Sequence, residues 1–336
     1  MHEVVVPAFA KLNLSLLVLG RRGDGYHELR TVFQTIGLAD RLTVRHQPGG
    51  PLRITLDDPL SIPGNLVLKA AQAVAEAAHL RGTWEMRLDK RIPMGGGLGG
   101  GSTDAAAVLL ALPALAGRPL TMAELERLAL SLGSDVPFFL HGGTSLGLGR
   151  GEELYPLSTP AAGHVLLATP GVHVSTPEAF RRLGRASVSE LTLPDPIPTL
   201  ETFRALVAAL MTVRPGAGWQ RYCHNDFEGP VFGLHPELSA LRRKLELAGA
   251  DPARMSGSGS TLFGVFPSRA KLREAGESLG GAPVVLTRFM NRARYRAAWF
   301  RALAKVVRTT QWPPQSPYAS HASSSRRSGP PRSTIR

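Results

Sequence analysis

The chain has 336 residues with 43% hydrophobic and 19% charged side chains, which is typical of a globular protein, and at about 150 residues per domain it predicts about two domains. No stretch reaches the roughly 18 uncharged apolar residues that a membrane span needs, so the sequence excludes a transmembrane protein. The single cysteine, Cys223, excludes an intrachain disulfide and favours a cytoplasmic location.

The formal net charge is +13, and most of this excess lies at the C-terminal end. No acidic residue follows Glu277, whereas eleven Lys or Arg lie between Arg288 and Arg336, which leaves +2 for residues 1–287. Because binding a phosphate backbone needs clustered cations, nucleic acid is not an expected partner. Residues 309–336 are rich in Ser and Pro and almost free of large aliphatic side chains, so we predict a disordered basic tail, more typical of a solvated extension than of a nucleic-acid arm.

The first part of the chain has β-like runs and one clear helix. The runs are residues 3–6, 12–19, 30–36, 41–45, 52–56 and 84–88. The helix begins after Asn65, a plausible N-cap, and stops before Gly82. Two further helices are predicted at residues 102–112 and from Thr121, where Thr121 and Glu124 have the spacing of a capping box.

A second lobe is expected to start between residues 154 and 170. It contains predicted strands at 165–168, 262–266 and 284–289 and predicted helices near 199–211, 236–248 and 268–279. Because strands and helices do not alternate regularly as βαβ units, we predict an α+β fold rather than a doubly wound parallel sheet.

A glycine-rich loop carries the strongest functional signal. Residues 95–101 contain six glycines directly before a predicted helix, so the backbone can approach a ligand closely and the helix can present free N–H groups to a phosphate. Gly95, Gly97 and Gly100 formally match a dinucleotide-binding pattern, but no buried parallel strand precedes them. A Walker A loop is absent because the chain has no Gly-Lys pair, and protein-kinase motifs are also missing. The alternative to a phosphate-binding loop is a flexible linker without a binding function.

Residues 93–103 resemble the ATP loop of the GHMP kinase superfamily (galacto-, homoserine, mevalonate and phosphomevalonate kinases) in its longer variant. Four other segments resemble motifs of the branch that phosphorylates 4-diphosphocytidyl-2-C-methyl-D-erythritol, in the expected order: residues 8–14, 23–29, 133–139 and 255–261. Departures are small, with Thr103 where the family commonly has Ser, and Ser134 and Ser260 where it commonly has Ala.

The resemblance implies a two-lobed α+β GHMP kinase fold. It divides the chain into an N-terminal ribosomal-S5-like lobe at residues 1–160, a C-terminal ferredoxin-like α/β lobe at residues 161–300, and the tail at 309–336. It also implies ATP-dependent phosphorylation of the substrate's 2-hydroxyl in the methylerythritol phosphate pathway to isoprenoid precursors.

The same resemblance assigns roles to residues. Asp135 would be the general base, and Lys11 would hold Asp135 and the substrate hydroxyl. On spacing alone, a surface turn aspartate and a strand lysine are the simpler interpretations of these two residues. The ATP phosphates would be bound by the loop, with Mg²⁺ carried by the phosphates and no protein metal site; its residues are Pro93, Met94, Gly95, Gly96, Gly97, Leu98, Gly99, Gly100, Gly101, Ser102 and Thr103.

The cytidyl diphosphate substrate would be held by Asn13, Tyr26, His27, Thr176 and Phe180, with Tyr26 and Phe180 stacking on the base. We interpret Asn225 as a helix cap, residues 256–260 as a turn behind the loop, and Asp104 as either a first-turn residue or a metal ligand. Two alternatives stay open at this point: a sibling GHMP kinase such as a mevalonate or homoserine kinase, and a non-catalytic sensor or nucleic-acid module on the same scaffold.

Overall fold

The structure is a computed structural model, and it describes residues 2–160, 163–187, 198–211, 218–279, 283–307 and 311–314. Its strands are β1 (His2–Arg21), β2 (His27–Gln47), β3 (Arg53–Asp57), β4 (Thr83–Asp89), β5 (Thr144–Leu148), β6 (Glu153–Leu157), β7 (His164–Ala168), β8 (Ala253–Met255), β9 (Leu262–Phe266) and β10 (Val284–Arg288). Its α-helices are α1 (Leu66–Ala77), α2 (Gly100–Ala116), α3 (Met122–Leu132), α4 (Val136–His141), α5 (Thr176–Leu183), α6 (Pro198–Met211), α7 (Glu228–Leu234), α8 (Pro236–Leu247), α9 (Arg269–Ser278) and α10 (Arg292–Ala302), with a 3-10 turn at Trp219–Tyr222.

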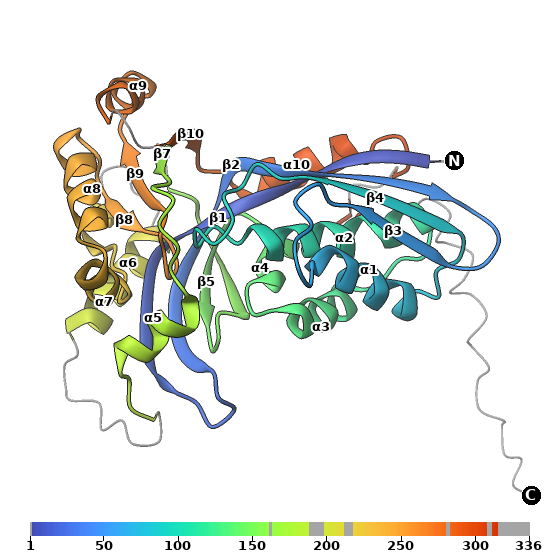
Figure 1. Ribbon diagram of the computed structural model, residues 1–336, viewed down its shortest axis with the longest axis horizontal. Helices are drawn as coiled ribbons and strands as arrows, with labels where there is room; N and C mark the ends of the chain where they lie inside the picture. The colour runs from blue at the N-terminus through green and yellow to red at the C-terminus, as the bar shows by residue number, and fades with distance from the viewer. Residues whose placement is uncertain are drawn as a thin grey trace, which may run out of the picture.

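A six-stranded sheet forms the first lobe. Its path is β3-β4-β2-β5-β6, and β1 also pairs with β2. All of its pairs are antiparallel except β3 with β4. β1 and β2 form a long hairpin that runs the length of this lobe and reaches into the second (Figure 1).

The hairpin differs from the predicted strands. Residues 3–6 and 12–19 are parts of one strand, as are 30–36 and 41–45. Register shifts between Phe9 and Lys11, between Asn13 and Ser15, and between Val18 and Gly20 let β1 continue against β2 past the positions where the alternation of apolar residues fails. Because a β-bulge keeps a strand paired while changing the face on which its residues lie, the pattern breaks although the strand does not.

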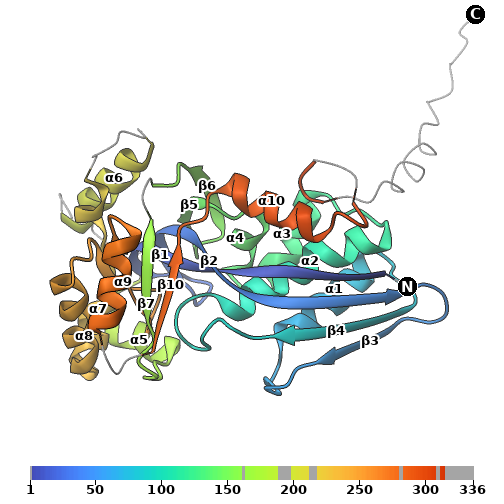
Figure 2. The ribbon, with the colours of Figure 1, turned by 90° about the horizontal axis from the view of Figure 1, so that it is seen from above.

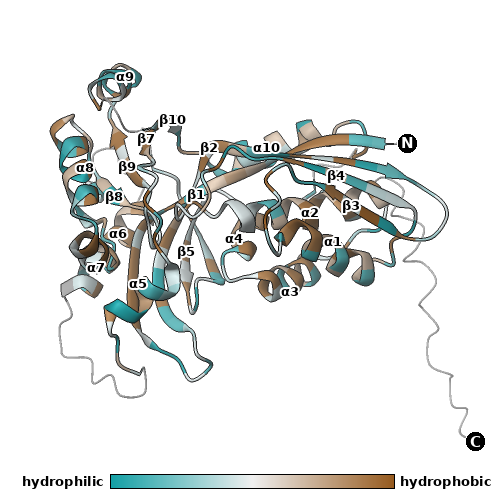
Figure 3. Cartoon of the chain, in the orientation of Figure 1, coloured by the Kyte–Doolittle hydropathy of each residue, from teal (hydrophilic) through white to brown (hydrophobic). Residues whose placement is uncertain are grey.

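Helices α1 to α4 cover one face of this sheet, and α2 is the central one. Its residues from Thr103 to Leu115 are buried, and from Ala105 onward they are apolar on every side, as expected of a helix enclosed by other elements (Figure 3). The two helix starts that the sequence predicts are confirmed. Asn65 accepts a hydrogen bond from the Val67 amide, and Thr121 and Glu124 form a capping box.

The second lobe has a four-stranded antiparallel sheet in the order β10-β7-β9-β8. Along the chain the strands and helices follow a β-α-β-β-α-β order, with several helices in the first crossover, which is the ferredoxin-like arrangement that we expected. Leu16 and Val18, at the end of β1, pack into the core of this lobe. The long hairpin therefore connects the two cores.

Two C-terminal segments lie where the sequence did not place them. Helix α10 falls in the predicted second lobe at 161–300, yet its Tyr295 and Trp299 are buried in the core of the first lobe, and Figure 2 shows the helix beside that lobe. Trp312, within the predicted tail, donates a hydrogen bond from its indole to the Leu140 carbonyl at 2.9 Å and packs its ring edge-on against Trp299. Order thus extends to residues 311–314, while 309–310 and 315–336 lie outside the described residues.

Candidate active site

The glycine-rich loop connects the end of β4 to α2, and its glycines are required by geometry. Gly95, Gly97 and Gly99 have φ of +67°, +74° and +72°. A Cβ on Gly97 would lie 2.0 Å from the Ser256 carbonyl oxygen, and one on Gly99 would lie 2.6 Å from the Phe139 ring. Because Gly99 is the N-cap of α2 and has no side chain to cover the helix end, the first N–H groups of α2 are available to an anion.

A second glycine-rich turn, residues 256–261, supports this loop from behind, as the sequence predicts. The Ser256 hydroxyl donates to the Gly97 carbonyl at 3.0 Å. Asn225 donates from its amide to the carbonyls of Met255 and Gly257, at 2.7 and 2.8 Å, while its oxygen accepts from the Phe227 amide. Asn225 therefore tethers the turn, and its predicted role as a helix cap is wrong, because the N-cap of α7 is Phe227 and has no side-chain cap hydrogen bond.

Lys11 and Asp135, which are 124 positions apart in sequence, lie together beside the loop. The Lys11 ammonium is 3.4 Å from an Asp135 carboxylate oxygen. Lys11 is almost fully buried, and its backbone amide donates to the Leu98 carbonyl at 3.0 Å, which connects β1 to the glycine loop. Asp135 occupies the N-cap position of α4 and keeps about a third of its side chain exposed. The arrangement places one cation and one accessible carboxylate side by side at the loop.

These two residues line a cavity of about 830 Å³ that extends from the glycine loop to the β1–β2 hairpin and α5. The same cavity is lined by Gly97 and Gly99 of the loop and by all five predicted substrate residues: Asn13, Tyr26, His27, Thr176 and Phe180. The structure therefore brings together in one cavity residues from five separate sequence segments.

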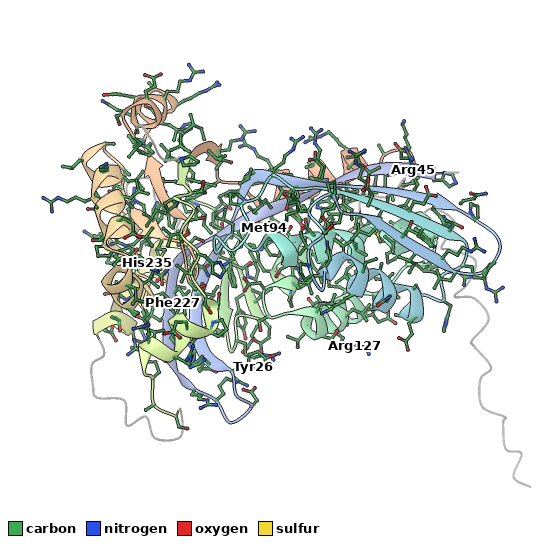
Figure 4. The ribbon with its side chains drawn as sticks, in the orientation of Figure 1. Tyr26, Arg45, Met94, Arg127, Phe227 and His235 are labelled. Carbon is green, nitrogen blue, oxygen red and sulfur yellow. The ribbon has the colours of Figure 1, made fainter. Side chains whose placement is uncertain are left out.

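Inside the cavity, the aromatic residues pair differently from the prediction. Phe180 stacks on His27, with ring centroids 4.4 Å apart and 21° between planes, and its edge meets Phe227. Tyr26 is half exposed near the hairpin turn, with the Arg150 guanidinium 4.3 Å from its ring centroid (Figure 4). Burial lowers the pKa of His27, and Arg21 lowers it further, so this imidazole is neutral at pH 7.

Two of the predicted substrate-binding residues, Asn13 and Thr176, form side-chain hydrogen bonds within the protein. The Asn13 side-chain oxygen accepts from Lys11 at 2.6 Å, and its amide donates to Thr31 at 2.8 Å. The Thr176 hydroxyl hydrogen-bonds to the Ser258 hydroxyl at 2.7 Å. Asn13 thus orients the ammonium of Lys11 through its side-chain oxygen.

The loop residues also differ in accessibility. Gly95, Gly101 and Met94 are exposed, and Pro93, Gly97, Gly99, Gly100 and Ser102 are half-buried. Gly96, Leu98 and Thr103 are buried, and the Leu98 side chain belongs to the core. The Thr103 hydroxyl is therefore enclosed, and Ser102 is the loop hydroxyl that a phosphate could reach.

Sequence reasoning missed the cations of the cavity. Arg21, Arg150 and Arg185 line it from the end of β1, from the turn between β5 and β6, and from the segment after α5. The only available signal was the Gly149-Arg150-Gly151 turn, whose position beside Tyr26 depends on the pairing of β5 with β2.

A buried ionic cluster holds both ends of the glycine loop. The Lys90 ammonium contacts carboxylate oxygens of Asp40 and Asp104, and the other Asp40 oxygen accepts from the Ile92 amide at 2.7 Å. Burial, together with the neighbouring Asp40 carboxylate, raises the pKa of Asp104 to about 7 although Lys90 opposes this. Asp104 is therefore an internal partner of Lys90, and its side chain is enclosed rather than facing the cavity.

Comparison with known proteins assigns both lobes to one family. The GHMP kinases N terminal domain matches residues 65–143, and the GHMP kinases C terminal domain matches residues 207–283. The chain is 48% identical to a 4-diphosphocytidyl-2-C-methyl-D-erythritol kinase of Solibacter usitatus, covering 93% of this chain and 96% of the relative. It is 41% identical to the protein of that name from a Synechococcus strain, covering 83% and 90%.

Solved structures of GHMP kinases also match this chain. A crystal structure of 4-(cytidine 5'-diphospho)-2C-methyl-D-erythritol kinase is 37% identical, with a TM-score of 0.69 over 85% of this chain and 98% of that one. A homoserine kinase from Cytophaga hutchinsonii, at 19% identity and a TM-score of 0.67, shares the fold, covering 87% of this chain and 96% of its own. The chain belongs to the GHMP kinases and, within them, to the family of 4-diphosphocytidyl-2-C-methyl-D-erythritol kinases.

Proposed function

We propose that this protein transfers the γ-phosphoryl group of ATP to the 2-hydroxyl of 4-diphosphocytidyl-2-C-methyl-D-erythritol, giving the 2-phosphate and ADP, in the methylerythritol phosphate pathway. The observation that supports this most directly is the Lys11–Asp135 pair, which lies at the glycine loop inside the cavity that also holds His27 and Phe180. A nucleotide phosphate bound at the loop and an alcohol bound beside Asp135 would meet in that cavity.

In this mechanism Asp135 accepts the proton of the 2-hydroxyl as its oxygen forms a bond to the γ-phosphorus and the bond to the ADP oxygen breaks. Lys11 stabilises the charge that develops on the attacking oxygen and holds the Asp135 carboxylate. Asn13 orients Lys11 through its side-chain oxygen. General base catalysis of this kind contributes about 10²–10⁴-fold to the rate.

The glycine loop would bind the ATP phosphates through the amides at the start of α2 and through the Ser102 hydroxyl. Within the described ranges no three His, Cys, Asp or Glu side chains group together as metal ligands, and the Asp104 carboxylate is enclosed beside Lys90. Mg²⁺ would be carried by the ATP phosphates and would neutralise part of their charge.

The substrate's cytosine would stack beside His27 and Phe180, with Tyr26 closing the outer side, and Thr176 would lie at the edge of the same pocket. The neutral His27 imidazole can both donate and accept, which suits the polar edge of a base. Arg21, Arg150 and Arg185 would contact the diphosphate, although Arg150 also pairs with Glu152 and Arg185 with Asp226.

The proposal is tested by measuring ADP release from the purified protein with this substrate, mevalonate, homoserine or galactose. Turnover only with the cytidyl compound is expected, because the other acceptors have no base to stack. Turnover with mevalonate but not with the cytidyl compound would assign a sibling reaction. If no ADP is released with any of the four acceptors, the protein would be a non-catalytic sensor.

The location of the protein is a smaller part of this proposal. Among the described helices none is long and apolar enough to cross a membrane. We propose a cytoplasmic enzyme, supported by its one cysteine, Cys223, which is free and buried.

A further inference from the structure

A second cavity, of about 690 Å³, lies on the other side of α4 from the catalytic cavity and shares none of its lining residues. It is bounded by α3, α4, the β5–β6 hairpin and α10. Helix α4 separates the two cavities, since Asp135 at its N-cap faces the first, whereas Pro137 and His141 line the second.

Two arginines of α10, one helical turn apart, give this cavity its charge. The half-buried Arg292 donates to the Gly142 and Thr144 carbonyls at 3.2 Å and to the Ser145 hydroxyl at 3.1 Å. Arg296 has its guanidinium 5.4 Å from the Trp312 ring centroid, and its Nε is buried without a hydrogen-bond partner. Over the ranges that the structure describes, neither arginine has a carboxylate within ion-pair distance.

The two carboxylates that line the cavity make contacts of their own, but only Glu152 has a cation as its partner, because burial lowers the pKa of the His141 imidazole beside Glu126. Glu126 is 2.8 Å from the His141 imidazole, and Glu152 pairs with Arg150. A third arginine, Arg127, lies on the outer side of α3 at the cavity's rim (Figure 4). Within the described residues, neither Glu126 nor Glu152 forms an ion pair with Arg292 or Arg296, so these two guanidinium groups have no carboxylate in direct contact.

Placing these two guanidinium groups next to each other is energetically unfavourable. Like charges at i and i+4 on a helix repel, and a partly buried cation is unfavourable unless it is paired. Accordingly, burial lowers the pKa of both arginines, and Arg296 lowers that of Arg292 further. An oxyanion between the two guanidinium groups would remove the repulsion and satisfy the buried Nε of Arg296, because planar guanidinium groups bind phosphate oxygens in pairs.

The rest of the lining is apolar. Leu130, Leu154, Pro137 and Pro156 border the cavity, and Leu130 is exposed to solvent. We propose that this cavity is a second ligand site, separate from the catalytic cavity, that binds a small molecule with a phosphate head between Arg292 and Arg296 and a short apolar body against these side chains. The site goes beyond the proposed function and does not depend on it.

The test is calorimetric titration with phenyl phosphate while an unreactive ATP analogue and the cytidyl substrate fill the catalytic cavity. The wild type is expected to bind the probe, and Arg296→Gln is expected to bind it about tenfold more weakly, since a charge-assisted contact of about 1.5 kcal/mol is lost. Arg294→Gln is the matched control, because Arg294 lies exposed on the same helix and does not line the cavity; it is expected to bind like the wild type.

The Arg296 side chain makes no hydrogen bond or ion pair among the described residues, and its guanidinium lies 5.4 Å from the Trp312 ring centroid, so its replacement is expected to preserve the fold and the rate of ADP release; unfolding and ADP release of the variant are measured first. Absence of binding by the wild type, or equal affinity of Arg296→Gln and Arg294→Gln, would overturn the site. Inorganic phosphate is expected to bind more weakly than phenyl phosphate, and equal affinities would overturn the apolar part of the proposal.

Discussion

Replacing Asp104 by Asn tests how the buried cluster beneath the glycine loop responds to pH. Asp104 is almost fully buried, one of its oxygens accepts from Lys90 at 2.7 Å, and the other has no hydrogen-bond partner. Asn has nearly the same shape but cannot ionise. Lys90 keeps the Asp40 carboxylate as its partner in the variant.

The magnitude follows from the pKa of Asp104, which is about 7 in the folded protein against an ordinary value of 3.8. Between these values the folded chain binds a proton that the unfolded chain releases, so the free energy of unfolding falls as pH rises from about 4 to about 7 and then levels off. A difference of about 3 pKa units corresponds to about 4 kcal/mol over this range. Asp104→Asn lacks this loss, so its stability relative to the wild type should increase with pH.

The assay is guanidinium unfolding of both proteins between pH 4.5 and 8, followed by tryptophan fluorescence, since Trp84 lies in the core of the same lobe. Asp89→Asn is a suitable control because Asp89 is about half exposed and pairs only with Arg91 at the surface. If the stability difference between Asp104→Asn and the wild type does not change with pH, the raised pKa and the reasoning from burial are both wrong.

Four further predictions concern catalysis, binding and the C-terminal segment. Asp135→Asn should lower kcat by about 10²–10⁴-fold with ATP affinity nearly unchanged, and unaltered turnover in the ADP-release assay would remove Asp135 from the mechanism. Gly97→Ala should weaken ATP binding in direct titrations, because its Cβ would overlap the Ser256 carbonyl; wild-type affinity would contradict this. Phe180→Ala should raise KM for the cytidyl substrate several-fold, from a stacking loss of about 1 kcal/mol, and leave KM for ATP unchanged; a change in both would indicate general damage. Trp312→Ala should lower the free energy of unfolding by about 2 kcal/mol, less than the 3–5 kcal/mol of a core tryptophan because Trp312 is half-buried, and an unchanged denaturation midpoint would show that this segment contributes nothing.

Much of the fold could be predicted because local patterns carry it. The cap at Asn65 and the box at Thr121 and Glu124 satisfy helix ends with neighbouring residues, so they can be recognised without tertiary contacts. The glycine loop can also be recognised locally, since the positive φ angles of Gly95, Gly97 and Gly99 favour glycine at these positions.

The errors arise where distant segments decide the outcome. The bulges in β1 arise because β2 pairs with it along its whole length. Helix α10 packs on the first lobe because Tyr295 and Trp299 are buried in the core of that lobe. Asp104 could not be assigned from sequence because its partner is Lys90, in the segment after β4, which also binds Asp40 of β2.

The sequence by itself determined the family and the glycine loop, because these depend on residue types at short, regular spacings; the base Asp135 and the cation Lys11 are predictions that come from the resemblance to that family. The contact between Lys11 and Asp135 was expected from the family resemblance, and the structure shows it. Only the tertiary structure decided that Asn13 accepts a hydrogen bond from Lys11, that Phe180 stacks on His27, and that Arg292 and Arg296 line a separate cavity. The physical reason is that charge pairing and stacking act over a few ångströms in space, whereas the partners are separated by as many as 153 positions along the chain, as for His27 and Phe180.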